Sequence, residues 1–146
     1  MTKINIVLKP VTKSDHIFLY QLLEQRNFHE NISHKKMPTF FQHVKFVTSK
    51  PYSKWYIIKY NDQKVGSIYL TKINEIGIHI VKEIRRKNVA TSALKILMKK
   101  NLRIRFLANI NPKNKKSIEF FIKQNFKLIQ YTYELIPSNS NKWTNW

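Results

Sequence analysis

The chain has no cysteine, only two glycines and only 8 acidic residues among its 146. Without cysteine it has no disulfide, no thiolate metal site and no cysteine acyl intermediate, and no metal site is expected. No stretch approaches the roughly 20 apolar residues that a membrane-spanning helix needs, and the start, MTKINIVLKP, lacks the apolar region of a signal peptide. We therefore expect a cytoplasmic protein with no membrane span.

Positive charge is what the chain has in excess: 27 lysines and arginines give a net charge of +19. The electrostatic field of this charge attracts anions, including nucleic acid, anionic membranes, nucleotide cofactors and nucleotide-linked substrates. The charge therefore indicates an anionic partner without identifying which one. Compositional drift toward lysine is the alternative explanation. The 42% hydrophobic and 13% aromatic content indicates a folded core, and the length fits one domain, over 1–136, followed by a tail over 137–146.

A central stretch joins a buried strand to an amphipathic helix through a basic turn. Ile76–Val81 is apolar at nearly every position, which predicts a central strand covered on both faces. From Val89 the apolar residues recur at helical spacing. The turn between them reads Arg85-Arg86-Lys87-Asn88, so three cations meet the amide groups of a helix start. This pattern favours an anion site, and a solvated basic turn is the alternative.

The rest of the chain shows alternating strand and helix patterns. Ser14 or Asp15 is expected to cap the first helix, which runs to Arg26, and Asn61-Asp62-Gln63 is expected to form a hairpin turn. The predicted elements are a strand over 3–9 stopped by Pro10, helices near 15–26 and 40–47, strands over 55–60, 64–71 and 75–81, a helix from 89 to about 100, a strand over 103–110, a helix over 117–124 and a last strand over 126–135.

Two motifs in this order carry a family resemblance. Arg85-Arg86-Lys87-Asn88-Val89-Ala90 resembles the pattern of Arg or Gln, two residues, Gly, one residue, then Gly or Ala that the GNAT superfamily of acetyl-CoA-dependent N-acetyltransferases carries between strand and helix. The stretch from Asn114 to Phe126 resembles a second family motif. Asn88 and Asn125 stand where the family has glycine, and asparagine is the other residue that tolerates a left-handed backbone. The implied fold is an α/β (α+β) GNAT fold: a mixed, mostly antiparallel central sheet flanked by helices, with splayed fourth and fifth strands.

The resemblance implies acetyl-CoA as co-substrate, with its thioester between the splayed strands. The backbone of the fourth strand would pair with the pantetheine, the turn and helix start would hold the pyrophosphate, and the second motif would contact the pantetheine. The residues implied are Ile78, His79 and Ile80 on the strand, Arg85, Arg86, Lys87, Asn88, Val89, Ala90 and Thr91 at the turn and helix start, and Asn114 and Phe121 in the second motif.

Acetyl transfer to an amine needs a base, stabilisation of the oxyanion and a proton for the departing thiolate. Glu75 is the candidate base because it begins the fourth strand, where several family members place a carboxylate. His79, on the same face, is the second candidate. The family tyrosine that protonates the thiolate corresponds here to Phe121, which has no proton to donate. We expect Tyr133 to replace it, with Tyr131 or water as alternatives.

The acceptor is suggested by shorter matches. Arg26-Asn27, His43, the run Trp55–Ile58 and the run Leu70–Ile73 resemble bacterial nucleotide-sugar N-acetyltransferases of the pseudaminic acid pathway type. This resemblance implies a primary amine on a nucleotide-linked sugar as acceptor. Arg26 as a helix cap and His43 at the edge of the core are the structural alternatives.

Other functions stay open from the sequence. Within the same fold, the acceptor could be a protein N-terminus or a small amine. Outside it, the chain could be a basic nucleic-acid-binding module, which the core spacing of most aromatic residues disfavours, or an inactive acyl-CoA-binding protein. We expect a monomer or a homodimer.

Overall fold

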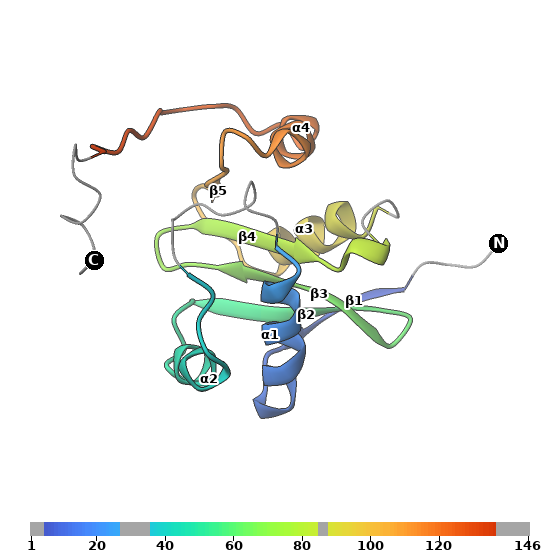
Figure 1. Ribbon diagram of the computed structural model, residues 1–146. Helices are drawn as coiled ribbons and strands as arrows, with labels where there is room; N and C mark the ends of the chain where they lie inside the picture. Colours follow the sequence, from blue (N-terminus) through green and yellow to red (C-terminus); the bar gives the residue numbers. More distant parts are fainter. Residues whose placement is uncertain (1–4, 27–35, 85–87, 137–146) are drawn as a thin grey trace.

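A computed structural model describes residues 5–26, 36–84 and 88–136 (Figure 1). Four of the predicted site residues, namely Asn27, Arg85, Arg86 and Lys87, lie outside these ranges. Everything below concerns the described residues.

The architecture is a mixed sheet of five strands in the order β1-β2-β3-β4-β5. The first three neighbouring pairs are antiparallel, and β4 pairs with β5 in parallel. This is the predicted GNAT fold. The strands are β1 (Ile6–Pro10), β2 (Lys54–Tyr60), β3 (Gln63–Leu70), β4 (Glu75–Ile80) and β5 (Leu107–Ala108).

Helices cover both faces of the sheet (Figure 1). The larger apolar cluster packs α3 against one face through Ala93, Leu94 and Leu97, and a smaller cluster joins α1 and α2 to the other face through Leu19, Val47 and Ile57. The two faces of the sheet are therefore covered by different helices. The helices are α1 (His16–Glu24), α2 (Phe40–Thr48), α3 (Val89–Lys100) and α4 (Lys115–Lys123), with short 3-10 turns at Lys13–Asp15 and Lys82–Ile84.

The β2–β3 hairpin forms where the turn residues predict it. Asn61 and Asp62 make a two-residue connection, and their φ angles of 47° and 69° are both left-handed. Two consecutive positive φ values match the right-handed twist of the flanking strands, and Asn and Asp tolerate them well. This hairpin fixes the register of β3 against β2.

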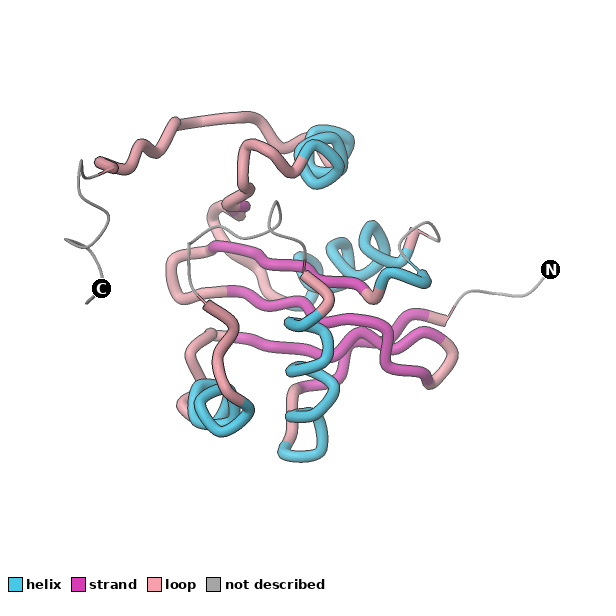
Figure 2. Tube along the Cα trace, viewed as in Figure 1, coloured by secondary structure: helices cyan, strands magenta, loops and turns pink. Residues whose placement is uncertain are grey.

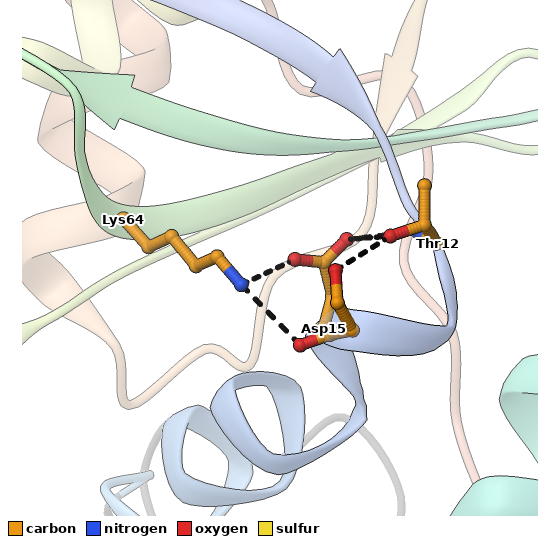
Figure 3. Close-up of polar contacts among 4 residues, drawn as sticks. Thr12, Asp15 and Lys64 are labelled. Carbon is orange, nitrogen blue, oxygen red and sulfur yellow. Dashed lines mark hydrogen bonds and ion pairs between the residues drawn. The ribbon is translucent and has the colours of Figure 1, made fainter.

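The start of α1 is held to β3 by a buried ion pair (Figure 3). Asp15 is only 5% exposed, and its carboxylate lies 2.6 Å from Nζ of Lys64. The same carboxylate accepts hydrogen bonds from the Thr12 amide at 2.8 Å and the Thr12 hydroxyl at 3.2 Å. Asp15 is the N-cap residue of α1, which is one of the two expected residues, but its side chain makes no bond to the helix because the carboxylate binds Thr12 and Lys64 instead.

Two sequence expectations about strands are wrong. The strand expected over 103–110 is reduced to Leu107–Ala108, because β5 stays beside β4 for only two residue pairs. The last strand expected over 126–135 is absent, and the chain after α4 is an extended loop (Figure 2). Strand propensity measures how well side chains fit a half-buried pleated surface, and within the described ranges no neighbouring strand supplies such a surface to this segment.

Candidate active site

The fourth and fifth strands separate after two residue pairs. Glu75 pairs with Leu107 and Ile76 with Ala108, and β4 then continues to Ile80 away from β5. The divergence of the two strands begins at Gly77. The backbone of residues 78–80, predicted to pair with pantetheine, therefore lies along the opening between the strands.

Asn88, at the start of α3, has the backbone conformation that the family motif needs at this position. Asn88 precedes the helix with φ of 57°, so asparagine does adopt the left-handed conformation expected of the family glycine. Val89 is buried in the core, and Thr91 accepts a hydrogen bond from the Gln124 side chain at 3.4 Å. Amides of a first helical turn attract anions, so the geometry fits the predicted pyrophosphate position.

The second motif forms α4 and its two ends. The Asn114 side-chain oxygen accepts from the Ser117 amide at 3.2 Å and so caps the helix. Phe121 is buried and packs edge-to-face against Phe120 and Phe126, with ring centroids 5.1 and 5.0 Å apart. Asn125 follows the helix with φ of 70°, the second asparagine at a family glycine position. In the described structure both Asn114 and Phe121 have clear structural roles.

A cavity of about 770 Å³ lies on the face of the sheet that α1 and α2 cover. The described residues that line it include two cations and one carboxylate, among aromatic and polar side chains. The predicted substrate residues Arg26 and His43, and the side chain of His79, all line it. Its lining is Leu19, Leu22, Leu23, Glu24, Arg26, Lys36, Met37, Pro38, Gln42, His43, Phe46, Tyr52, Trp55, Ser67, Tyr69 and His79.

Two tyrosines in this cavity stack on each other and on a glycine. The rings of Tyr52 and Tyr69 are nearly parallel, 5° apart in plane, with centroids 3.8 Å apart. Tyr69 lies directly opposite Gly77 in the β3–β4 register. A Cβ built at Gly77 would lie 2.1 Å from Cζ and 2.4 Å from the hydroxyl oxygen of Tyr69, so only glycine lets the ring lie across β4 here. Burial raises the pKa of both hydroxyls, which therefore stay protonated near neutral pH.

Two buried nitrogens on residues lining the cavity have no hydrogen-bond partner among the described residues. They are Nε2 of His43 and Nε1 of Trp55. His43 is 6% exposed, and burial, followed by the charge of His16, lowers its pKa, so the ring is neutral near pH 7. Buried polar atoms in native proteins nearly always have partners, so these two favour a polar ligand or water beside them.

Glu75 lies where β4 and β5 begin. Its carboxylate accepts from the Thr71 hydroxyl at 3.5 Å and from the side-chain amide of Asn109, just after β5. The Thr71 hydroxyl also accepts from the Glu75 amide at 3.0 Å. Glu75 is therefore oriented at the narrow end of the gap between the strands, a suitable place for a base.

The structure brings some predicted residues together and separates others. Arg26, His43 and His79 share the cavity, and Glu75 lies two residues before Gly77 on the same face of β4. Tyr133 is 88% exposed on the extended loop and is not among the cavity residues, so its role as a proton donor stays a prediction. The sequence did not predict the pair of Tyr52 and Tyr69, because the pair depends on the register that places Tyr69 opposite Gly77.

The described residues contain no group of three side chains suited to hold a metal ion. No helix among them is long and apolar enough to cross a membrane.

Comparison with known proteins agrees with this geometry. Residues 17–126 match the family described as Acetyltransferase (GNAT) family. The chain belongs to this family. It is an acyltransferase that uses acetyl-CoA. Among curated proteins, none matches the chain significantly.

Solved structures of GNAT enzymes share the fold at low sequence identity. An acetyltransferase from Thermus thermophilus is 18% identical, with 89% of this chain and 92% of that one covered and a TM-score of 0.72. Mutant forms of the spermidine/spermine N-acetyltransferase SpeG from Vibrio cholerae are 17% identical, with 92% and 87% covered and a TM-score of 0.70. The ribosomal L7/L12 alpha-N-protein acetyltransferase RimL, in complex with coenzyme A, is 17% identical, with 88% and 86% covered and a TM-score of 0.70.

Proposed function

We propose that this GNAT enzyme transfers the acetyl group of acetyl-CoA to a primary amine on a nucleotide-linked sugar. The observation that carries the proposal is the composition of the cavity under α1 and α2. Among the described lining residues, Arg26 and Lys36 supply two positive charges against one carboxylate, Glu24, and the aromatic rings of Tyr52 and Trp55 also line the cavity. Cations suit a diphosphate, and aromatic rings suit a nucleobase or a sugar ring.

The size and unsatisfied polarity of the cavity support a large polar acceptor. About 770 Å³ lies within the range of small-molecule sites, which is roughly 300–1,000 Å³. The buried nitrogens of His43 and Trp55 lack partners among the described residues, and an acceptor with hydroxyl or carbonyl groups would relieve that cost.

The cofactor is proposed to bind along the edge of β4 that is no longer paired with β5 after Ile76. Acetyl-CoA would place its thioester where β4 leaves β5, near Gly77, and run its pantetheine along the backbone of Ile78, His79 and Ile80. The pyrophosphate would lie at the start of α3, on the backbone from Asn88 to Thr91, with Arg85, Arg86 and Lys87 adding charge.

Glu75 is proposed as the base that keeps the acceptor amine neutral, directly or through a water molecule. Its carboxylate is fixed by Thr71 and Asn109 at the end of β4 from which the strands diverge. The neutral amine attacks the thioester carbon, and the amine proton passes to Glu75. Because a free thiol has a pKa of about 8.5, the thiolate is a tolerable leaving group near neutral pH and can take its proton from water.

The described lining of the cavity argues against a polyamine acceptor. A polycation such as spermidine needs several carboxylates near its path, and Glu24 is the only one among the cavity residues. The net charge of +19 repels a polycation further. A protein N-terminus remains the second candidate acceptor and is one arm of the test.

The test is an acetyl-transfer assay that follows thiol release from acetyl-CoA. Four acceptors are compared: a UDP-linked 4-amino sugar, the same amino sugar without the nucleotide, spermidine, and a short peptide with a free N-terminus. We expect the UDP-linked sugar to react at least ten-fold faster than the others at equal concentration. Arg26→Gln should raise the KM of that acceptor, whereas Lys9→Gln, a charge change outside the cavity, is the control. A preference for the peptide or spermidine would overturn the nucleotide-sugar assignment.

A further inference from the structure

The hydroxyl of Tyr69 lies at the point where the two splayed strands begin to diverge. Pairing between β4 and β5 ends at Ile76, and Gly77 is the next residue. The far end of the Tyr69 ring lies over Gly77, since a Cβ there would be 2.1 Å from Cζ and 2.4 Å from the hydroxyl oxygen. The side chain therefore reaches across β4 from β3 and presents a hydroxyl group at the opening.

The Tyr69 hydroxyl keeps its proton near neutral pH. Burial raises the pKa of this group, so it is present as a neutral hydroxyl that can donate a hydrogen bond.

Tyr69 is also held firmly. One face of its ring stacks on Tyr52 at 3.8 Å between centroids, and its far end lies on the backbone at Gly77. A donor that is already fixed and partly shielded from water stabilises a developing charge without reorganising during the reaction.

We propose that Tyr69 donates a hydrogen bond to the thioester oxygen as that oxygen becomes an anion during acetyl transfer. The inference rests on the proposed binding of the thioester at Gly77. Neither of the other two candidates supplies a hydroxyl group near Gly77, because Phe121 has none and Tyr133 is exposed on the loop after α4.

The step balances without a proton leaving Tyr69. The amine nitrogen bonds to the carbonyl carbon, and the carbonyl π electrons move to oxygen, where the Tyr69 hydrogen bond stabilises them. The amine proton passes to Glu75. The oxyanion then re-forms the carbonyl, the carbon–sulfur bond breaks with its electron pair on sulfur, and the thiolate takes a proton from water. Glu75 gives its proton to the hydroxide that is left, which restores the carboxylate and the water. The products are an amide and a thiol.

The experiment compares Tyr69→Phe with the wild-type protein in two reactions. One is acetyl transfer to the amine that the wild-type protein uses best, and the other is slow hydrolysis of acetyl-CoA, in which water forms the same kind of oxyanion. Removing one oxyanion donor costs about 10²–10³ in kcat in known enzymes. We expect a fall of about 10²-fold in kcat in both reactions, with the KM of acetyl-CoA and of the amine within two-fold of wild type.

Tyr60→Phe is the matched control, because it removes a hydroxyl from β2, away from the cavity residues. Its kcat should equal that of the wild-type protein. The thermal midpoint and calorimetric CoA affinity of Tyr69→Phe should match the wild-type values, since the stacked ring is kept. A purely structural role for Tyr69 would instead lower the midpoint or raise both KM values.

The outcomes separate this inference from the proposed function. Unchanged kcat in Tyr69→Phe, with the wild-type protein active, overturns the role of Tyr69 and leaves the acetyltransferase assignment in place. If the wild-type protein acetylates another amine and not the UDP-linked sugar, and Tyr69→Phe lowers kcat for that amine, the role of Tyr69 is supported and the nucleotide-sugar acceptor is overturned. A wild-type protein that turns over neither water nor any amine overturns both.

Discussion

Asn88 and Asn125 both adopt a left-handed backbone conformation, with φ of 57° and 70°. They lie at the ends of two helices that a side-chain hydrogen bond connects. Asn88 precedes α3 and Asn125 follows α4, and the Gln124 side chain donates to Thr91 at 3.4 Å between them. Both positions are glycine in the motifs that the chain resembles. Asparagine is the non-glycine residue that visits this conformation most readily, so both departures keep the backbone of the family loop.

Replacing Asn88 therefore separates backbone conformation from side-chain chemistry. Asn88→Gly should keep stability within about 1 kcal/mol and keep acetyl-CoA affinity, because glycine adopts the same φ freely. Asn88→Val should lose about 1–2 kcal/mol, since a β-branched residue is strained there, and should weaken acetyl-CoA binding. Urea denaturation and calorimetry measure both quantities. Equal affinities for the valine and glycine variants would show that the loop backbone does not hold the cofactor.

Much of the fold could be predicted because local patterns and tertiary contacts agree. The hairpin at Asn61-Asp62, the apolar strand at 75–80 and the helix from Val89 form close to where the sequence places them. Each depends on turn chemistry or apolar spacing within a few residues. The divergence of β4 and β5 is predicted by the family resemblance alone, and in the structure their pairing ends just before Gly77.

The rest depends on contacts that the sequence does not fix. The stretch 127–136 has strand-like alternation, yet it runs as a loop because no strand of the described chain lies beside it, and Tyr133 is exposed there. The stack of Tyr52 on Tyr69 depends on the register of β3 against β4, which places Tyr69 opposite Gly77. A shift of one residue would turn Tyr69 to the other face, so the tyrosine pair could be recognised only once the register was known.

Gly77→Ala tests how tightly this pair is packed. The added methyl group would lie 2.1 Å from Cζ of Tyr69, so the ring must move and lose its stack on Tyr52. Overpacking of this kind costs about 1–3 kcal/mol. We expect thermal and urea unfolding to show that loss in the wild-type background and a much smaller one in the Tyr69→Ala background. An equal cost in both backgrounds would show that strain in β4 itself, and not the ring, is the cause.

The ion pair of Asp15 and Lys64 should make stability depend on pH in acid. Burial alone would raise the pKa of Asp15, but hydrogen bonds and charge from Lys64 and Thr12 outweigh it and hold the pKa below its ordinary value of 3.8. A lowered folded-state pKa gives stability that is complete above 3.8 and is lost as the pH falls through the lower folded value.

The matching variant is Asp15→Asn. At about pH 7 this substitution should lower the free energy of unfolding by about 1–3 kcal/mol, because it removes the carboxylate that pairs with Lys64. The difference in unfolding free energy between the two proteins should shrink as the pH drops below 3.8. Asp62→Asn, in the exposed turn, is the control and should change stability little. A difference between wild type and Asp15→Asn that is constant from neutral pH into acid would contradict the linkage.

Glu75→Gln tests the proposed base. The amide keeps the size of the carboxylate and can still bond to Thr71, so the β4–β5 junction should survive. General-base catalysis contributes about 10²–10⁴-fold, and we expect kcat to fall at least ten-fold while acetyl-CoA affinity is unchanged. The loss should lessen at higher pH, where more of the amine is already neutral. Turnover equal to that of the wild-type protein would remove Glu75 from the mechanism and make His79 the next candidate.

A binding titration decides between specific cofactor recognition and general attraction of anions to a chain of charge +19. In the proposed binding mode, backbone amides at the start of α3 hold the pyrophosphate of acetyl-CoA, whereas a diffuse positive field is screened within about 10 Å at 0.1 M salt. Acetyl-CoA should therefore bind saturably, more tightly than ADP, and lose only a few-fold in affinity from low to moderate salt. A random oligonucleotide should lose affinity steeply over the same range, as counterion release requires. If the oligonucleotide bound and acetyl-CoA did not, the positive charge would serve nucleic acid, and the fold would have lost the cofactor site of its family.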